Sequence, residues 1–341
     1  MNHNPLISVV VPVYNGGHFL ARCLSAINAS SFKSYELIVV DDCSTDDSAK
    51  MSAAMGARVL SMKTQSGPAS ARNYGSLQAR GEILFFVDAD VVVQPDTLGR
   101  VADDLGQHTD VAAIFGSYDD SPAEKNFVSQ YKNLYHHFIH QNSRTEAATF
   151  WAGCGAIRRD VFVEVGGFDD TAYSRPSIED IELGLRLKKS GHRILLDKQL
   201  QVKHLKEWRL SSLLRTDIFS RAVPWSNLII KNHQKVDDLN LQGSHKLSAA
   251  CVGLGLLILP LAAFRPYLVL PTILLLLVTI IGLNSRLYRF FLDRRGFTFV
   301  SRAIPLHLLY YFYSGVTFVL CSAYGRVSRV HLMEAPLIKR V

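Results

Sequence analysis

Three long apolar runs without a charged residue place the strongest constraint on how this chain can fold. They lie in its C-terminal third, at residues 247–264, 267–283 and 303–324. Because a helix needs roughly 17–25 apolar residues to cross the hydrocarbon core of a bilayer, each run is long enough to span a membrane. Arg265 and Pro266 separate the first two runs, which predicts a helical hairpin.

The basic residues gather around these runs. Residues 241–341 hold eleven Lys or Arg and two acidic residues, whereas residues 1–240 hold 26 basic and 28 acidic residues. A nucleic-acid-binding protein is expected to carry its positive charge across a folded domain, so the asymmetry argues against nucleic acid as a partner and indicates a membrane-associated tail. An arginine cluster follows the second run, at Arg286, Arg289, Arg294, Arg295 and Arg302.

Arginine clusters next to membrane spans are expected on the cytoplasmic side. This orientation predicts a multi-pass protein, of a bacterial inner membrane, whose residues 1–240 face the cytoplasm. If the third run also spans, the basic tail at residues 326–340 ends on the opposite side, against the same tendency. A third segment that is interfacial or re-entrant would remove the conflict, so two spans and three spans both stay open.

The N-terminal part has a different pattern, in which short apolar, β-rich runs alternate with segments of helical spacing. Strands are expected at residues 7–13, 36–41, 58–62, 83–87 and 111–115, and helices at 17–29, 45–55, 68–79 and 96–107, with Thr45 as an N-cap. Nearly continuous apolar strands indicate a sheet covered on both faces. The alternation predicts an α/β fold with a mainly parallel sheet flanked by helices.

Polar residues follow the first, second and fourth of these strands, at the edge where ligands bind in such sheets. After the fourth strand come Asp88, Ala89 and Asp90. Alternation along an extended segment points the two carboxylates to one side, where they can bind a hard cation such as Mg²⁺ or Mn²⁺. The alternative is a solvated turn with two capping carboxylates.

With these residues the chain resembles the family 2 glycosyltransferases, which have the GT-A fold and use nucleotide-diphosphate sugars. The resemblance covers about residues 6–210. It rests on Val-Pro-Val-Tyr-Asn at 11–15, Val-Asp-Asp-Cys-Ser-Thr-Asp at 40–46, Gly-Pro-Ala-Ser-Ala-Arg-Asn at 67–73, Phe-Val-Asp-Ala-Asp at 86–90, Gly-Gly-Phe-Asp at 166–169 and Glu-Asp at 179–180. Each motif is short, but their order and spacing together are specific.

The resemblance implies a role for individual residues. Asp180 would be the catalytic general base, and Asp88 and Asp90 would hold Mg²⁺ or Mn²⁺. Contacts to the nucleotide sugar are implied for Pro12, Tyr14, Asn15, Asp41, Asp42, Arg72, Asp88 and Ala89, with Tyr14 against the base and Arg72 facing the nucleotide or its diphosphate. Weaker acceptor or sugar contacts are implied for Trp151, Gly153, Asp169 and Glu179. Without the resemblance, Glu179 and Asp180 equally suit the positive end of a helix dipole.

We therefore expect three regions: a catalytic domain at residues 1–208, interfacial helices or a linker at 209–246, and a transmembrane region at 247–341. Residues 208–231 interleave apolar and basic positions, a pattern that suits the membrane interface or a helix packed on the catalytic domain. The Gln-x-x-Arg-Trp box of processive family members is absent, since the corresponding stretch reads His-Leu-Lys-Glu-Trp-Arg at 204–209.

The expected activity is inverting, metal-dependent transfer of one sugar from a UDP- or GDP-sugar to a membrane-associated acceptor, either a glycolipid or another lipid-linked molecule. A polyprenyl phosphate is the alternative acceptor, and because it is already anionic it needs no strong base. A hypothesis of another class is a non-catalytic membrane scaffold that keeps the nucleotide-binding fold.

Overall fold

The computed structural model describes residues 4–232 and 243–334. The chain forms two compact units, Met1–Leu210 and Ser211–Val341. Residues 233–242 of the expected interfacial region and residues 335–341 of the expected basic tail lie outside the described residues.

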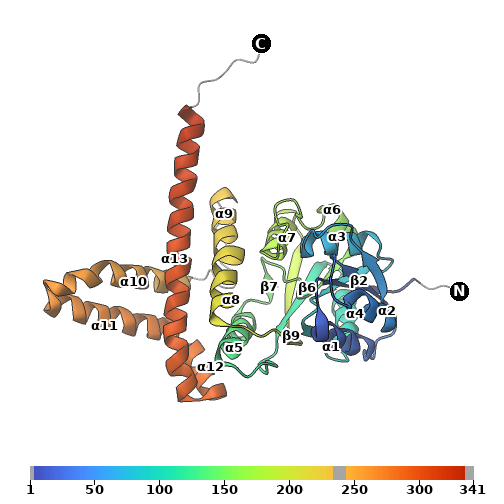
Figure 1. The fold of residues 1–341 in the computed structure, drawn as a ribbon, viewed down its shortest axis with the longest axis horizontal. Helices are drawn as coiled ribbons and strands as arrows, with labels where there is room; N and C mark the ends of the chain where they lie inside the picture. The colour runs from blue at the N-terminus through green and yellow to red at the C-terminus, as the bar shows by residue number, and fades with distance from the viewer. Residues whose placement is uncertain (1–3, 233–242, 335–341) are drawn as a thin grey trace, which may run out of the picture. The chain divides into compact units, whose positions relative to one another are not determined.

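The N-terminal unit is built around a mixed sheet (Figure 1). Its strands run in the order β3-β2-β1-β4-β8-β6-β9-β5, with β7 also paired to β9. Strands β3, β2, β1 and β4 are parallel, whereas β8 is antiparallel to both β4 and β6. The strands are β1 (Ile7–Val13), β2 (Tyr35–Asp41), β3 (Arg58–Ser61), β4 (Ile83–Val87), β5 (Val91–Val92), β6 (Val111–Tyr118), β7 (Glu146–Ala147), β8 (Cys154–Arg158) and β9 (Arg193–His204).

Helices cover both faces of this sheet, which explains why its central strands are apolar throughout. They are α1 (Gly17–Asn28), α2 (Ser48–Ala54), α3 (Pro68–Leu77), α4 (Thr97–Gln107), α5 (Phe127–Asn142), α6 (Arg159–Glu164) and α7 (Glu179–Lys189). Neighbouring strand residues alternate between two cores: Phe85 packs with α1 and α4, and Phe86 packs with α6 on the other face. The expected α/β sheet with flanking helices is confirmed.

Most expected elements are present within a few residues, but the predicted N-cap at Thr45 is wrong. Helix α2 begins at Ser48 with Asp47 at its N-cap. The Thr45 backbone N–H instead donates a hydrogen bond to Asn15 Oδ1 at 2.7 Å. The loop after β2 is thus held to the loop after β1, and this long-range bond displaces the local cap.

The C-terminal unit is helical. Its elements are α8 (Leu210–Arg215, which starts at the boundary), a π-helical segment η1 (Thr216–Ala222), α9 (Val223–Asn232), α10 (Gly243–Ile258), a 3₁₀ segment η3 (Leu259–Ala263), α11 (Pro266–Leu283), α12 (Ser285–Arg295) and α13 (Phe297–Glu334). Helices α10 and α11 pack side by side as the expected hairpin (Figure 1). By length and composition, three stretches could cross a membrane: Gly243–Ala263, Pro266–Leu283 and Phe297–Tyr324.

Two helix glycines, Gly184 in α7 and Gly99 in α4, allow the packing of α7 to be tested. A Cβ atom on Gly184 would clash with the backbone nitrogen of Phe150, whereas a Cβ atom on Gly99 in α4 would lie 4.0 Å from Phe32 Cβ. We predict that Gly184→Ala destabilises the protein by about 1–3 kcal/mol through overpacking. Gly99→Ala should leave stability unchanged or raise it, since alanine favours a helix over glycine. Thermal unfolding midpoints of the detergent-purified protein measure both, and equal midpoints would contradict the packing described.

Candidate active site

The expected polar clusters meet at one edge of the sheet. Val13 at the end of β1 is in register with Asp41 at the end of β2. The Asp42 backbone N–H then donates to the Val13 carbonyl oxygen at 2.8 Å. Strand β4 runs parallel to β1 and ends at Val87, so Asp88 emerges at the same edge. The carboxyl ends of three parallel strands therefore present their polar residues together.

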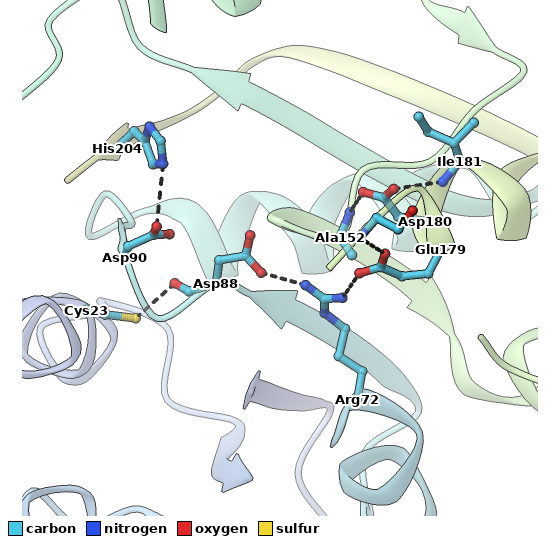
Figure 2. A network of polar contacts seen from close by, with 10 residues as sticks. Cys23, Arg72, Asp88, Asp90, Ala152, Glu179, Asp180, Ile181 and His204 are labelled. Atoms are coloured by element: carbon cyan, nitrogen blue, oxygen red, sulfur yellow. Dashed lines mark hydrogen bonds and ion pairs between the residues drawn. The ribbon is translucent and has the colours of Figure 1, made fainter. Parts of the chain in front are cut away.

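Arg72 connects two of the motifs at this edge. One guanidinium nitrogen donates to Asp88 Oδ1 at 2.6 Å and another donates to Glu179 Oε1 at 3.0 Å (Figure 2). The Arg72 side chain is only 5% exposed, so both ion pairs lie largely out of solvent. Its Nε has no hydrogen-bond partner among the described residues. Desolvation raises the pKa of Asp88, although the Arg72 charge opposes that shift. The fork of Arg72 thus ties the Asp-x-Asp segment to the start of α7.

Asp90 lies next to His204, a residue for which the sequence suggested no role. Its Oδ2 lies 3.6 Å from Nε2 of His204, the last residue of β9 (Figure 2). The His204 ring is buried and stacks on Tyr118, with ring centroids 4.2 Å apart. Burial alone would raise the pKa of Asp90, but His204 holds it below its usual value. A histidine at the end of an alternating strand is the only signal that could have suggested this pair.

Asp180 is held at the first turn of α7 by backbone donors. Its Oδ2 accepts from the Ala152 N–H at 3.2 Å, and its Oδ1 accepts from the Ile181 N–H at 2.8 Å (Figure 2). Burial and the neighbouring Glu179 charge raise the pKa of Asp180 to about 7, against the lowering effect of Arg72. A carboxylate with a pKa near neutrality can accept a proton at physiological pH.

The residues expected to bind the nucleotide lie at the ends of β1 and β2. Tyr14 is 48% exposed, whereas Pro12 is buried within β1. The Asp42 carboxylate accepts from the backbone N–H groups of Ser66 and Gly67, at 2.7 and 2.8 Å. Asp41 accepts from the Ser44 N–H, and Asn15 Oδ1 accepts from Thr45. In this structure the three polar side chains brace the loops, and the Tyr14 ring is accessible for stacking.

The residues expected to make weaker acceptor or sugar contacts do not all lie beside the Asp-x-Asp segment. Gly153 lies beside the Asp-x-Asp segment, since its carbonyl oxygen accepts from the Asp88 N–H at 3.3 Å. Trp151 is half-buried and packs edge-to-face on Tyr118. Asp169 is exposed, and its carboxylate accepts from the Ala172 N–H, which is a local turn contact. Ala89 is partly buried between the two aspartates and packs against the apolar core.

Asp88 and Asp90 are the residues expected to bind a divalent cation. Within residues 4–232 and 243–324, no three His, Cys, Asp or Glu side chains surround a common point that could hold a metal ion. Mg²⁺ usually binds one or two carboxylates together with substrate phosphates. The Asp88 and Asp90 side chains are 33% and 27% exposed, with the His204 imidazole beside them. This donor set fits an ion that arrives with a nucleotide diphosphate.

Comparison with known proteins agrees with this geometry. Residues 8–166, which include β1 to β8 and both aspartates of the Asp-x-Asp segment, match Glycosyl transferase family 2. The chain carries a glycosyl transferase family 2 domain. The mixed sheet with flanking helices is accordingly a GT-A fold, followed by a helical C-terminal unit.

Relatives of this family 2 domain come from several bacteria. Over 118 residues, 33% of this chain and 39% of the relative, it is 36% identical to glycosyltransferase GlyG of Streptococcus pneumoniae. Over 115 residues it is 35% identical to the poly(ribitol-phosphate) β-N-acetylglucosaminyltransferase TarS of Staphylococcus aureus, a match to 31% of this chain and 20% of TarS. The chain therefore spans well under half the length of these two relatives.

Two solved structures share the fold. The mannosyltransferase PcManGT of Pyrobaculum calidifontis, solved with GDP-Man and Mn²⁺, superposes with a TM-score of 0.59 at 18% identity, covering 93% of this chain and 88% of that one. TarS residues 1–349, solved with UDP-GlcNAc, superpose with a TM-score of 0.52 at 19% identity, covering 94% and 92%. At this identity the likeness establishes the GT-A fold of the family 2 domain.

The buried Arg72 bridge generates a stability prediction. Arg72→Ala leaves the Asp88 and Glu179 carboxylates without their partner, and removing one member of a buried ion pair costs on the order of 3–5 kcal/mol. We expect a cost near the lower end of this range, since Asp88 is partly exposed. The control is Lys50→Ala, because Lys50 and its partner Asp47 are 87% and 82% exposed and a surface ion pair is worth about 1 kcal/mol or less. Thermal unfolding compares the variants, and equal shifts would refute a structural role for the bridge.

Proposed function

We propose that this protein is an inverting, metal-dependent glycosyltransferase that moves one sugar from a nucleotide-diphosphate sugar to a membrane-associated acceptor. The observation that carries the proposal is the convergence of Asp88, Arg72 and Glu179 through direct contacts, with Asp180 next to Glu179. This convergence unites the Asp-x-Asp segment with the expected general base at the ligand-binding edge of the sheet. The scaffold alternative has no comparable support, because a merely structural role does not require a half-buried carboxylate with a pKa near 7.

The donor is proposed to bind across the ends of β1, β2 and β4. Tyr14 offers an accessible ring for stacking on a nucleobase, and the loops that Asp41 and Asp42 brace would present backbone groups to the nucleotide. The buried Arg72 Nε–H has no partner among the described residues, which supports a contact to the donor diphosphate. PcManGT was solved with GDP-Man and TarS with UDP-GlcNAc, so GDP-sugars and UDP-sugars are both candidate donors.

Asp88 and Asp90 would hold Mg²⁺ or Mn²⁺ together with the donor phosphates, and His204 would orient Asp90. When bound, the ion would offset the negative charge that develops on the departing nucleotide diphosphate. Arg72 keeps Asp88 fixed next to α7, so the leaving group and the base face one cleft. The surrounding side chains must also exclude water, since water would hydrolyse the donor.

Asp180 is proposed to take the proton of the attacking acceptor hydroxyl. The two backbone bonds from Ala152 and Ile181 fix its carboxylate, and its raised pKa makes it a competent base near neutral pH. One displacement with one base inverts the anomeric centre. A hydroxyl on a glycolipid or another lipid-linked acceptor needs such a base, whereas a polyprenyl phosphate does not, so the properties of Asp180 favour the hydroxyl.

The acceptor is proposed to be membrane-associated because the same chain carries membrane-length helices. The arginine-rich segment around α12 supports an orientation with residues 1–210 in the cytoplasm, where nucleotide sugars are available, and a bacterial inner membrane as the location. The absence of the processive box supports transfer of a single sugar.

The proton-acceptor role of Asp180 predicts a specific pH profile. Transfer should fall about tenfold per pH unit below about 7, as Asp180 becomes protonated, and should level off above that value. Asp180→Asn should lower the rate by about 100-fold or more and abolish this dependence. Glu182→Gln is the control, because Glu182 lies on the same helix and bonds to Arg186 instead. Retained transfer to an added polyprenyl phosphate by Asp180→Asn would overturn the preference for a hydroxyl acceptor.

The metal assignment predicts that donor binding depends on a divalent cation. Calorimetry with UDP-GlcNAc and GDP-mannose should show binding in Mn²⁺ or Mg²⁺ for at least one donor and at least a tenfold loss in EDTA. Asp90→Ala should abolish this enhancement, while Asp103→Ala, on the exposed side of α4, should retain it. Equal affinity in EDTA and in Mn²⁺ would refute the metal role of Asp90.

A further inference from the structure

The three membrane-length stretches of the C-terminal unit do not all run in the same direction. Helices α10 and α11 lie side by side, but α13 crosses the base of this hairpin (Figure 1). The side chains that line the apolar cavity between the three helices agree with such a crossing. Helix α10 contributes Cys251, Val252, Gly255 and Leu256 to this cavity, and α11 contributes residues between Ile273 and Ile280. Helix α13 contributes Leu308, Leu309 and Phe312. Helix α13 therefore lines this cavity over little more than one turn.

A polar cluster joins α13 to the base of the hairpin, where α10 begins and α11 ends. The Tyr311 hydroxyl donates to Asn284 Oδ1 at 2.8 Å, and Asn284 Nδ2 donates to Ser248 Oγ at 3.0 Å. His245 Nδ1 lies 2.9 Å from the same Tyr311 hydroxyl. We call these four residues the base cluster. Ser248, Asn284 and Tyr311 are all buried, so the cluster fixes one depth in all three helices.

The depth of the base cluster in the bilayer limits which of the three helices can span it. The centre of the run 303–324 lies at Tyr313, only two residues from Tyr311. If α13 spanned, the base cluster would lie close to the bilayer midplane, and the exposed Arg286, two residues beyond Asn284, would lie in hydrocarbon. An exposed arginine at that depth is strongly disfavoured. Tyr313 would also bring the carboxylate of Asp217 to the same depth, since its hydroxyl donates to Asp217 Oδ2 at 2.8 Å.

If the hairpin of α10 and α11 crosses the membrane instead, these polar and charged groups lie outside the hydrocarbon. With the hairpin across the membrane, Pro266–Leu283, which ends just before Asn284, gives a helical stretch of about 27 Å, close to the hydrocarbon thickness. The base cluster then lies at the level of the lipid head groups, and Arg286, Arg289 and Arg302 are exposed at the same level. Arg265 is the single charged residue at the far turn of the hairpin.

We propose that the chain crosses the membrane twice, through α10 and α11, and that α13 lies in the plane of the membrane interface. Its partner is the phospholipid surface. Exposed apolar side chains on one face of α13 would contact the upper acyl chains, at Phe312, Val316, Val319 and Leu320. Tyrosines such as Tyr310 and Tyr313 suit the head-group level, and Arg302 pairs with lipid phosphates. This arrangement keeps the basic tail on the same side as α12, which removes the charge conflict of a third span.

Cysteine accessibility tests the topology in the full-length protein. Arg265→Cys, Thr298→Cys and Tyr324→Cys are introduced singly into a variant without the five native cysteines, and a membrane-impermeant maleimide is added to spheroplasts before or after permeabilisation. We expect Arg265→Cys to be labelled in intact spheroplasts, and Thr298→Cys and Tyr324→Cys only after permeabilisation. Labelling of Tyr324→Cys in intact spheroplasts would establish a third span. If Arg265→Cys also needs permeabilisation, the hairpin does not cross, and the proposal is equally wrong.

Depth measurements provide a readout that does not depend on topology or on activity. Spin labels at Phe312, Val316 and Val319, three exposed positions of α13, are compared by their collision rates with oxygen and with a polar nickel complex in liposomes. An in-plane helix gives similar, shallow depths at all three positions, whereas labels on the hairpin at Leu256 and Leu277 should be deep. A spanning helix would give depths that change steadily from Phe312 to Val319. Either result stands whether or not transfer activity is found.

Discussion

The site depends on one buried guanidinium. Arg72 pairs with Asp88 from the end of β4 and with Glu179 from the start of α7, although these residues are far apart in the sequence. A buried cation of this kind is tolerated only when its charge is compensated, so both carboxylates must approach it. This requirement holds the start of α7 against the sheet edge, and Asp180 is the next residue.

The carboxylates of the site have contrasting surroundings. Asp90 lies next to His204, which holds its pKa below the usual value, whereas burial and Glu179 raise the pKa of Asp180 to about 7. One environment suits a group that stays ionised to bind a cation, and the other suits a group that takes up a proton. The proposed roles of Asp90 as metal ligand and of Asp180 as base follow from these two environments.

Polar contacts have a comparable role in the C-terminal unit. Hydrophobic length alone qualifies three stretches as spans, because hydropathy counts residues and ignores their direction. The hydrogen bonds among Ser248, Asn284 and Tyr311 set a common depth for three helices. That shared depth is what makes an in-plane α13 compatible with the exposed arginines, which hydropathy could not reveal.

Periodicity and apolar content determined much of this protein from the sequence: the limits of β1 and β4 agree with expectation to the residue, and the α/β class, the family and the helical hairpin follow from local patterns. The sequence also named Asp88, Asp90, Arg72 and Asp180 as members of a site. It placed the helix start at Thr45 wrongly, because the Thr45 N–H donates a long-range hydrogen bond to Asn15 Oδ1 and the helix begins only at Ser48. Only the tertiary structure decided that Arg72 bonds to Asp88 and Glu179, that His204 faces Asp90, and that α13 crosses the hairpin, since each depends on contacts between residues that no local pattern relates.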